Sequence, residues 1–307
     1  MLSRRSAVSG LMAVPFLARA GHAQQGPVAV VATFSILADV VKAIGGDHVA
    51  VSALVGADGD AHSYAPTPAD ARQLAQARLV VVNGLGFEGW IQRLIRSSGT
   101  RAKVVTASEG VTPLKAESGH SHGHSHGHSH GANDPHAWQN VANVKTYARN
   151  IAAALGEADP ARREAFAAAA VAYVAKLDAL DAEVKAAMSA IPAAQRRILT
   201  THDAFRYYSG AYGVEFVALR GVSSESEPSA REVAAIIRQV RERKVAAVFM
   251  ENIADPRSIQ RIAAETGAKI GGRLYSDALS EAGGPAATYI DLIRHNTRQI
   301  VEAIRAA

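Results

Sequence analysis

The sequence predicts an α/β fold of two lobes, each a four-stranded parallel sheet flanked by helices, joined by one long rigid helix. Short apolar segments alternate with helical segments up to residue 107 and again after residue 191, a pattern typical of parallel sheets that helices cover on both faces. An alanine-rich helical stretch over 141–189 separates the two series. Its second part, from Pro160, would extend roughly 45 Å at about 1.5 Å per residue. That length suits a strut between two lobes.

The first series predicts strands at 28–33, 49–55, 79–84 and 103–107. After the first strand, apolar residues at helical spacing predict a helix that closes at Gly45-Gly46. Thr67 is a candidate N-cap, and Pro68 suits the first turn of the next helix. The segment WIQRLIRSSG at 90–99 predicts a third helix. We assign 24–140 to the N-terminal lobe.

The second series predicts strands at 197–201, 215–219, 245–250 and 269–275. Helices are expected over 204–213 and 229–244. A further helix should follow the third of these strands and end at Gly267, and a last helix should follow the fourth strand and reach the end of the chain. We assign 141–190 to a helical linker that contains the interlobe helix, and 191–307 to the C-terminal lobe.

A segment in the middle of the chain breaks this alternation. Residues 108–133 lack apolar residues at strand or helix spacing, and 119–131 read GHSHGHSHGHSHG. Such a segment buries too little apolar surface to offset its ordering entropy, so we expect a disordered His-rich loop over 116–132. The loop is a candidate auxiliary site that collects or buffers metal, with a solvated spacer as the alternative. Its six imidazoles belong to His120, His122, His124, His126, His128 and His130.

The N-terminal segment has the features of a secretory signal peptide. It has a positively charged start, a small and apolar run over 6–18, and small residues in GHA at 21–23. A bilayer span needs about 20 residues, so this run is too short and we expect no membrane insertion. Arg4 and Arg5 resemble a twin-arginine export signal, with an ordinary export signal as the alternative. We therefore expect 1–23 to be removed and the mature protein to be periplasmic.

Charge and cysteine content exclude several classes of protein. Removal of Arg4, Arg5 and Arg19 with the signal leaves 30 basic against 28 acidic residues, which is not the charge of a nucleic-acid-binding protein. The chain contains no cysteine, so we expect no disulfide, no thiolate metal site and no cysteine-linked lipid anchor. We also expect a monomer.

Four residues with metal-binding side chains lie at the expected functional edge of the sheets. His62 follows the second strand, His136 lies where order returns after the loop, and His202 and Asp277 follow strands of the second series. Ligands of open parallel sheets bind beyond the carboxyl ends of the strands, so these groups would meet between the lobes. Three imidazoles and a carboxylate suit tetrahedral Zn²⁺. A lone histidine at a strand end is more often a surface or hydrogen-bonded residue, and spacing alone leaves both interpretations open.

Longer stretches of the sequence resemble the zinc-type members of the cluster A-I family of metal-binding proteins that serve ABC transporters. The resemblance implies a two-lobed fold with a long connecting helix, and metal ligands at His62, His136, His202 and Asp277. Manganese members carry glutamate where His202 stands, and zinc members often carry a His-rich loop before the second ligand. The stretches that resemble the family are HSYAPTPAD at 62–70, VVVNGLGFEGW at 80–90, DPHAW at 134–138, THDAFRYYSGAYG at 201–213, SSESEPSAREV at 223–233, VFMEN at 248–252 and YSDALS at 275–280.

The resemblance implies capture and delivery rather than catalysis. We expect a periplasmic protein that binds Zn²⁺ and delivers it to an ABC-type permease, whose partner ATPase drives import. Asp134, Glu251 and Tyr64 are candidates for orienting the ligands through hydrogen bonds. The alternatives are a periplasmic zinc chaperone or buffer, a manganese-type binding protein and a surface adhesin. A zinc hydrolase would need an open coordination position, which the site has only if Asp277 is not a ligand.

Overall fold

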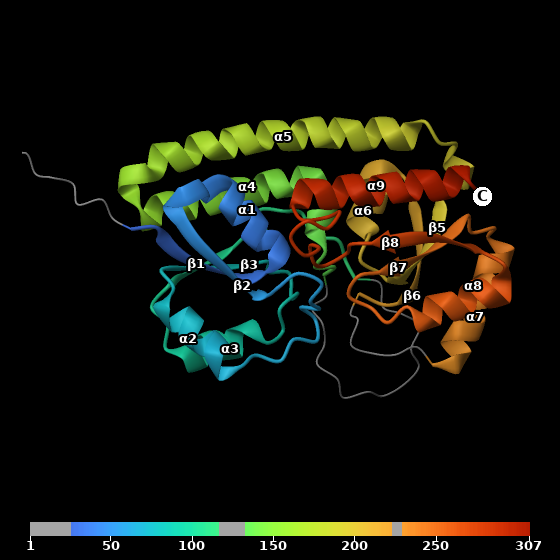
Figure 1. Cartoon of the computed structure of the whole chain (residues 1–307), viewed down its shortest axis with the longest axis horizontal. Helices are drawn as coiled ribbons and strands as arrows, with labels where there is room; N and C mark the ends of the chain where they lie inside the picture. Colours follow the sequence, from blue (N-terminus) through green and yellow to red (C-terminus); the bar gives the residue numbers. More distant parts are fainter. Residues whose placement is uncertain (1–25, 117–132, 223–228) are drawn as a thin grey trace, which may run out of the picture.

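The computed structural model describes residues 26–116, 133–222 and 229–307. They form two lobes, each built on a four-stranded parallel sheet, and a long helix runs over both (Figure 1). The predicted fold class is confirmed. The predicted signal peptide and all but the first residue of the predicted His-rich loop lie outside the described residues.

The N-terminal lobe follows the predicted alternation. Its elements are β1 (Val28–Phe34), α1 (Ser35–Gly45), β2 (Val49–Val55), α2 (Pro68–Gln76), β3 (Leu79–Val82), α3 (Ile91–Ser98) and β4 (Lys103–Thr106). The strands stand in the order β2-β1-β3-β4. All four residues of β3 are buried, as expected for an interior strand covered on both faces. Thr67 caps α2 as predicted, because its side chain accepts a hydrogen bond from the backbone N–H of Asp70.

The C-terminal lobe repeats this architecture. Its elements are β5 (Arg197–His202), α6 (Arg206–Tyr212), β6 (Glu215–Arg220), α7 (Ala230–Glu242), β7 (Ala247–Glu251), α8 (Arg257–Thr266), β8 (Lys269–Leu274) and α9 (Tyr289–Arg305). The strand order β6-β5-β7-β8 matches that of the first sheet. His202 is the last residue of β5 instead of following it, so its backbone belongs to the sheet.

Two helices connect the lobes. α4 (Val141–Ala158) ends before the predicted interruption at Asp159-Pro160, and α5 (Arg163–Ser189) continues for 27 residues. Figure 1 shows α5 running above both lobes, with α4 and α9 beneath it. The hydroxyl of Tyr212 donates a hydrogen bond to Asp181 of α5 at 3.0 Å, which ties this helix to the second lobe. Treating 141–190 as a linker separate from both lobes stays a prediction.

The strand order determines where each sheet can hold a ligand. In both sheets the first and third strands are neighbours, and the loops that leave their carboxyl ends diverge, which is the usual ligand position in open α/β sheets. In the second sheet this point holds His202 at the end of β5 and Glu251 at the end of β7. In the first sheet Glu88 occupies the equivalent place and accepts hydrogen bonds from Thr33 and from the backbone N–H of Asn83.

No helix within the described ranges combines the length and the apolar character needed to cross a membrane.

Candidate metal centre

The structure brings the four predicted ligands to one point between the lobes. His62, His136, His202 and Asp277 each offer one ligand atom, and these atoms all lie within 4.8 Å of one another. Nε2 of His62 lies 3.2 Å from Nε2 of His136 and 3.2 Å from Oδ2 of Asp277. Nε2 of His202 lies 3.2 Å from the same Oδ2, and Nε2 of His136 lies 3.7 Å from Oδ1. The four residues are at most 5% exposed.

These separations match the size of a tetrahedral metal site. A tetrahedron with bonds of about 2.0–2.1 Å places its corners about 3.3 Å apart, and three of the measured separations are 3.2 Å. The donors would be three imidazole nitrogens and one carboxylate oxygen, a set that suits a borderline divalent cation. Small movements of the side chains would complete the coordination.

Each histidine of the first lobe is held by an aspartate two residues before it. The backbone N–H of His62 donates to Asp60 at 2.9 Å, and that of His136 donates to Asp134 at 3.0 Å. Each carboxylate thereby fixes the loop that presents a ligand. Sequence reasoning named Asp134 and missed Asp60, although the repeated Asp-x-His spacing in GDAH and NDPH was available as a signal.

Two carboxylates orient the imidazole rings. Nδ1 of His136 lies 2.8 Å from Asp134, and Nδ1 of His202 lies 2.6 Å from Oε2 of Glu251. With Nδ1 engaged, the opposite nitrogen of each ring points to the centre. The other oxygen of Glu251 accepts the backbone N–H groups of Thr201 and His202 at 2.7 and 2.9 Å. Tyr64 instead donates its hydroxyl to Asp70 at 2.9 Å, and the contacts described for it include no hydrogen bond to any of the four residues.

The first lobe positions the carboxylate of the second. The carbonyl of Ser276, next to Asp277, accepts hydrogen bonds from the indole of Trp138 at 2.9 Å and the amide of Gln139 at 2.8 Å. Two residues further on, the backbone N–H of Leu279 donates to the hydroxyl of Ser35 at 3.0 Å. These contacts hold the segment after β8 against the other lobe. Sequence reasoning missed Gln139 and Ser35, since no local pattern marks a contact between lobes.

Comparisons with known proteins agree with this geometry. The family model described as the zinc-uptake complex component A, periplasmic, matches residues 30–303. The chain belongs to this zinc-uptake component A family. The iron-binding protein YfeA of Yersinia pestis is 37% identical over 265 residues, which cover 86% of this chain and 82% of the relative.

Two further relatives extend the comparison. The manganese ABC transporter substrate-binding lipoprotein PsaA of Streptococcus anginosus is 32% identical over 281 residues, covering 90% of this chain and 88% of the relative. The solved structure of the periplasmic zinc-binding protein TroA from Treponema pallidum superposes with a TM-score of 0.82 at 31% identity, covering 91% of this chain and 99% of that one.

Membership in the zinc-uptake component A family establishes the general function. The family consists of solute-binding proteins of ABC transporters and not of enzymes, so the hydrolase alternative is set aside. The chain is an extracytoplasmic metal-binding protein whose partners are a transporter permease and its ATPase.

The site of this family member holds protons when no metal is bound. Burial lowers the pKa of His136, but Asp277 and Asp134 raise it by more, to about 9. Burial also opposes protonation of His202, yet Glu251 and Asp277 hold its pKa well above the usual value. Burial would raise the pKa of Asp277, but His202 and His136 hold it well below its usual range. A metal ion bound here would therefore replace protons.

Glu251→Gln should weaken metal binding, because the amide is a poorer acceptor for the Nδ1 proton of His202 and leaves the ring less basic. We expect the affinity to fall by about 10- to 100-fold, as when other carboxylate partners of metal-bound histidines are removed. Competitive titration with a chromogenic chelator measures this. Glu183→Gln, which removes an exposed partner of Arg294, is the matched control; an equal loss there would contradict the assignment.

Metal affinity should rise with pH up to about pH 9. The pKa of His136, about 9, lies above the ordinary value of 6.5, so its imidazole is protonated below pH 9 and must lose a proton to bind a metal. Each proton released contributes about a tenfold change in affinity per pH unit. Calorimetry in buffers of different ionisation enthalpy counts the protons. Binding at pH 7.5 without proton release would be inconsistent with this electrostatic picture.

Proposed function

We propose that this protein captures Zn²⁺ outside the cytoplasm and delivers it to the permease of its ABC transporter. The observation that supports zinc is the donor set of His62, His136, His202 and Asp277 at tetrahedral separations. We assign all four as metal ligands. Zn²⁺ commonly takes four such ligands in a closed site.

The choice of zinc over manganese depends mainly on His202. Manganese suits oxygen ligands in octahedral geometry, and the site offers a single carboxylate among three imidazoles. The relatives are named for iron, manganese and zinc, so family membership alone does not select the metal. The completely buried ring of His202 leaves little room for the additional water ligands of a six-coordinate ion.

Loading and release require local movement, because the ligands are buried. The segment after β8 and the loop that carries His62 meet where the backbone N–H of Asp58 donates to the carbonyl of Leu279 at 2.9 Å. These loops carry ligands from opposite lobes, so their separation opens the site. The long helix α5 restrains wider opening, and zinc binding orders the loops more than it moves the lobes.

His202→Glu should change metal preference. Replacement of one imidazole by a second carboxylate favours harder ions, so zinc affinity should fall by at least about tenfold while the preference for Mn²⁺ over Zn²⁺ rises. Elemental analysis and competitive titration of the wild type and the variant measure both. His48→Glu, at an exposed residue outside the site, is the control. Equal zinc and manganese affinities in the wild type would refute the zinc assignment. If the wild-type protein did not restore zinc uptake to a strain that lacks its gene, a chaperone role would be favoured instead.

The His-rich loop supplies a second, weaker zinc-binding role in this proposal. Its six histidines lie outside the described residues, but Lys115 and Asn133 on either side of it form an antiparallel β-bridge. The ends are therefore close enough for the loop to be shortened without displacing its neighbours. Deletion of 119–131 should lower the number of zinc ions bound per chain and leave the tight site unchanged. Elemental analysis after dialysis tests this, and unchanged stoichiometry would eliminate the collecting role.

A further inference from the structure

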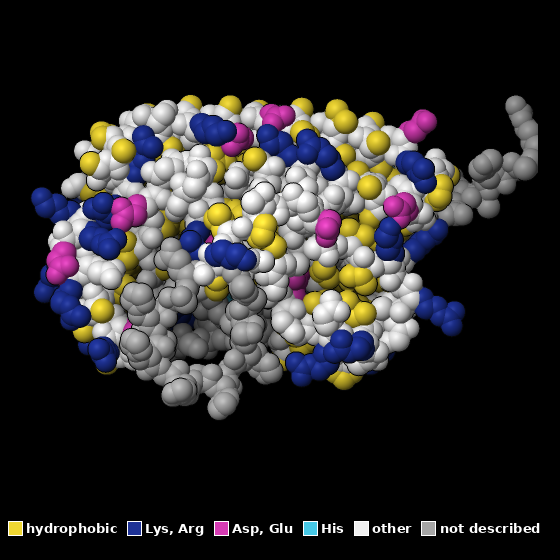
Figure 2. All heavy atoms as spheres, turned by 180° about the vertical axis from the view of Figure 1, so that it is seen from behind, with side chains coloured by type: hydrophobic (Ala, Val, Ile, Leu, Met, Phe, Trp, Pro, Cys, Tyr) yellow, Lys and Arg dark blue, Asp and Glu magenta, His cyan; other side chains and the backbone are white. Residues whose placement is uncertain are grey.

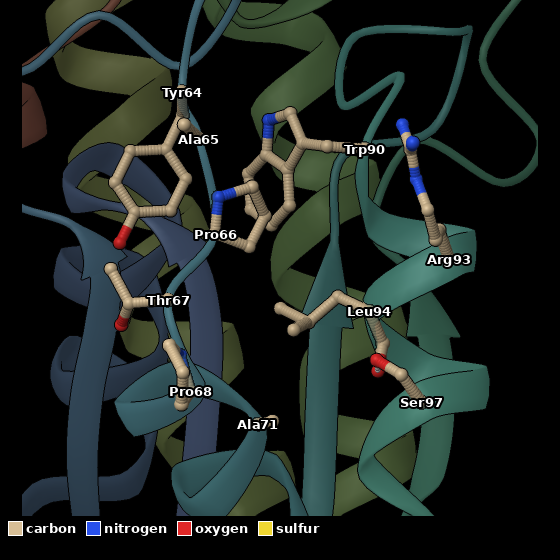
Figure 3. Close-up of a pocket in the computed structure, with 10 residues that line it drawn as sticks. All are labelled: Tyr64, Ala65, Pro66, Thr67, Pro68, Ala71, Trp90, Arg93, Leu94 and Ser97. Atoms are coloured by element: carbon tan, nitrogen blue, oxygen red, sulfur yellow. Dashed lines mark hydrogen bonds between the residues drawn. The ribbon is translucent and has the colours of Figure 1, made fainter.

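A groove on the first lobe lies close to the metal centre but takes no part in it. Its volume is about 600 Å³, and it runs between the segment that enters α2 and the helix α3 (Figure 3). Tyr64, Pro66, Trp90 and Leu94 face into it from the two sides, and Arg93 extends along one edge. The groove thus combines aromatic and proline walls with a cationic rim.

The aromatic walls are fixed before any partner binds. The rings of Tyr64 and Trp90 pack with centroids 5.1 Å apart. The indole N–H of Trp90 donates to the carbonyl of Ala61 at 2.8 Å, and the hydroxyl of Tyr64 donates to Asp70. Rigid aromatic surfaces lose little conformational entropy on binding, which favours recognition.

The surface around the groove carries several exposed arginines. Residues 64–101 contain five arginines, and their two acidic residues, Asp70 and Glu88, are both buried. All five are exposed, and among the described residues Arg72, Arg93 and Arg96 form no ion pair. Figure 2 shows Lys and Arg side chains gathered beside hydrophobic ones at lower right, the part of the molecule that holds α2 and α3.

The groove lies next to the loop that presents His62, which is where a partner that receives the metal would bind. Tyr64 lies two residues after His62, and the segment 64–68 continues from the loop that presents this ligand. A partner seated in the groove would therefore lie beside the point where the two lobes meet over the metal. A receptor that takes up the metal must approach this face.

We propose that the groove docks an outward-facing segment of the permease that carries carboxylates beside proline or aromatic side chains. This inference rests on delivery to a permease and specifies where the contact forms. Arginine forms bidentate, charge-assisted hydrogen bonds with carboxylates, and proline-rich segments bind grooves lined by aromatic residues. Charge complementarity of this kind sets association rate and partner choice.

The test uses the zinc-loaded protein and its cognate permease–ATPase complex in proteoliposomes. The measured quantity is the concentration of binding protein that gives half-maximal zinc uptake. The double variant Arg93→Glu/Arg96→Glu should raise this concentration about tenfold or more, with maximal uptake and zinc affinity unchanged. Raising NaCl from about 50 to 300 mM should weaken the wild type more than the variant, because salt screens exposed charges. Arg238→Glu, at an exposed arginine of α7 with no described ion pair, is the control and should have no effect.

Several outcomes would overturn the docking site. One is an unchanged half-saturating concentration in the double variant; another is an equal effect of Arg238→Glu. Flotation with anionic vesicles that lack the complex, if it depended on the same arginines, would make the membrane surface the partner instead. If the wild type transports manganese and not zinc, the zinc proposal fails, and the same titration with manganese still decides the docking site. A wild type that supports uptake of neither metal would overturn both.

Discussion

The buried carboxylate of Asp277 imposes the constraint on which the rest of the site depends. An isolated charge in a protein interior costs several kcal/mol unless an opposite charge compensates it. Here the compensation comes from His136 and His202, whose Nε2 atoms lie 3.7 and 3.2 Å from the carboxylate and whose pKa values the neighbouring carboxylates raise, whereas burial lowers the pKa of His62. The Asp134 and Glu251 carboxylates lie at the Nδ1 atoms of His136 and His202 and add negative charge on the outer side of these rings. In the proposed metal site, a divalent cation would thus take the place of the protons.

Both lobes contribute residues to this centre. The second sheet places His202 at the end of β5, where the strand order makes neighbouring loops diverge, whereas His62 and His136 lie on the segments that follow β2 and β4 of the first sheet. The hydrogen bonds from Trp138 and Gln139 to Ser276 bring the carboxylate of one lobe to the imidazoles of the other. In the proposed mechanism, the long α5 restrains the two lobes and the loops move. Metal capture and release would then be local events that a partner bound at the rim can influence.

Metal identity and partner recognition are separate properties of the molecule. The first depends on a few donor atoms in a dry centre, where replacing one imidazole by a carboxylate changes the preferred ion. In the docking proposal, the second depends on exposed residues of α2 and α3, whose arginines form no ion pair among the described residues. Relatives named for different metals are 31–37% identical to this chain, which agrees with this separation.

The amino-acid sequence by itself determined the alternation of strands and helices, the capping of α2 by Thr67, the break at Asp159-Pro160 and the four metal-binding side chains. The first three follow from short-range signals, apolar periodicity and cap and breaker residues, whereas the four side chains were singled out by their positions after strands together with the family resemblance. Tertiary structure alone decided the separations between ligand atoms and the hydrogen bonds from Trp138 and Gln139 to the carbonyl of Ser276, which lies 138 and 137 positions later in the chain. Such contacts join segments whose proximity arises only when the lobes pack together, so no local pattern records them.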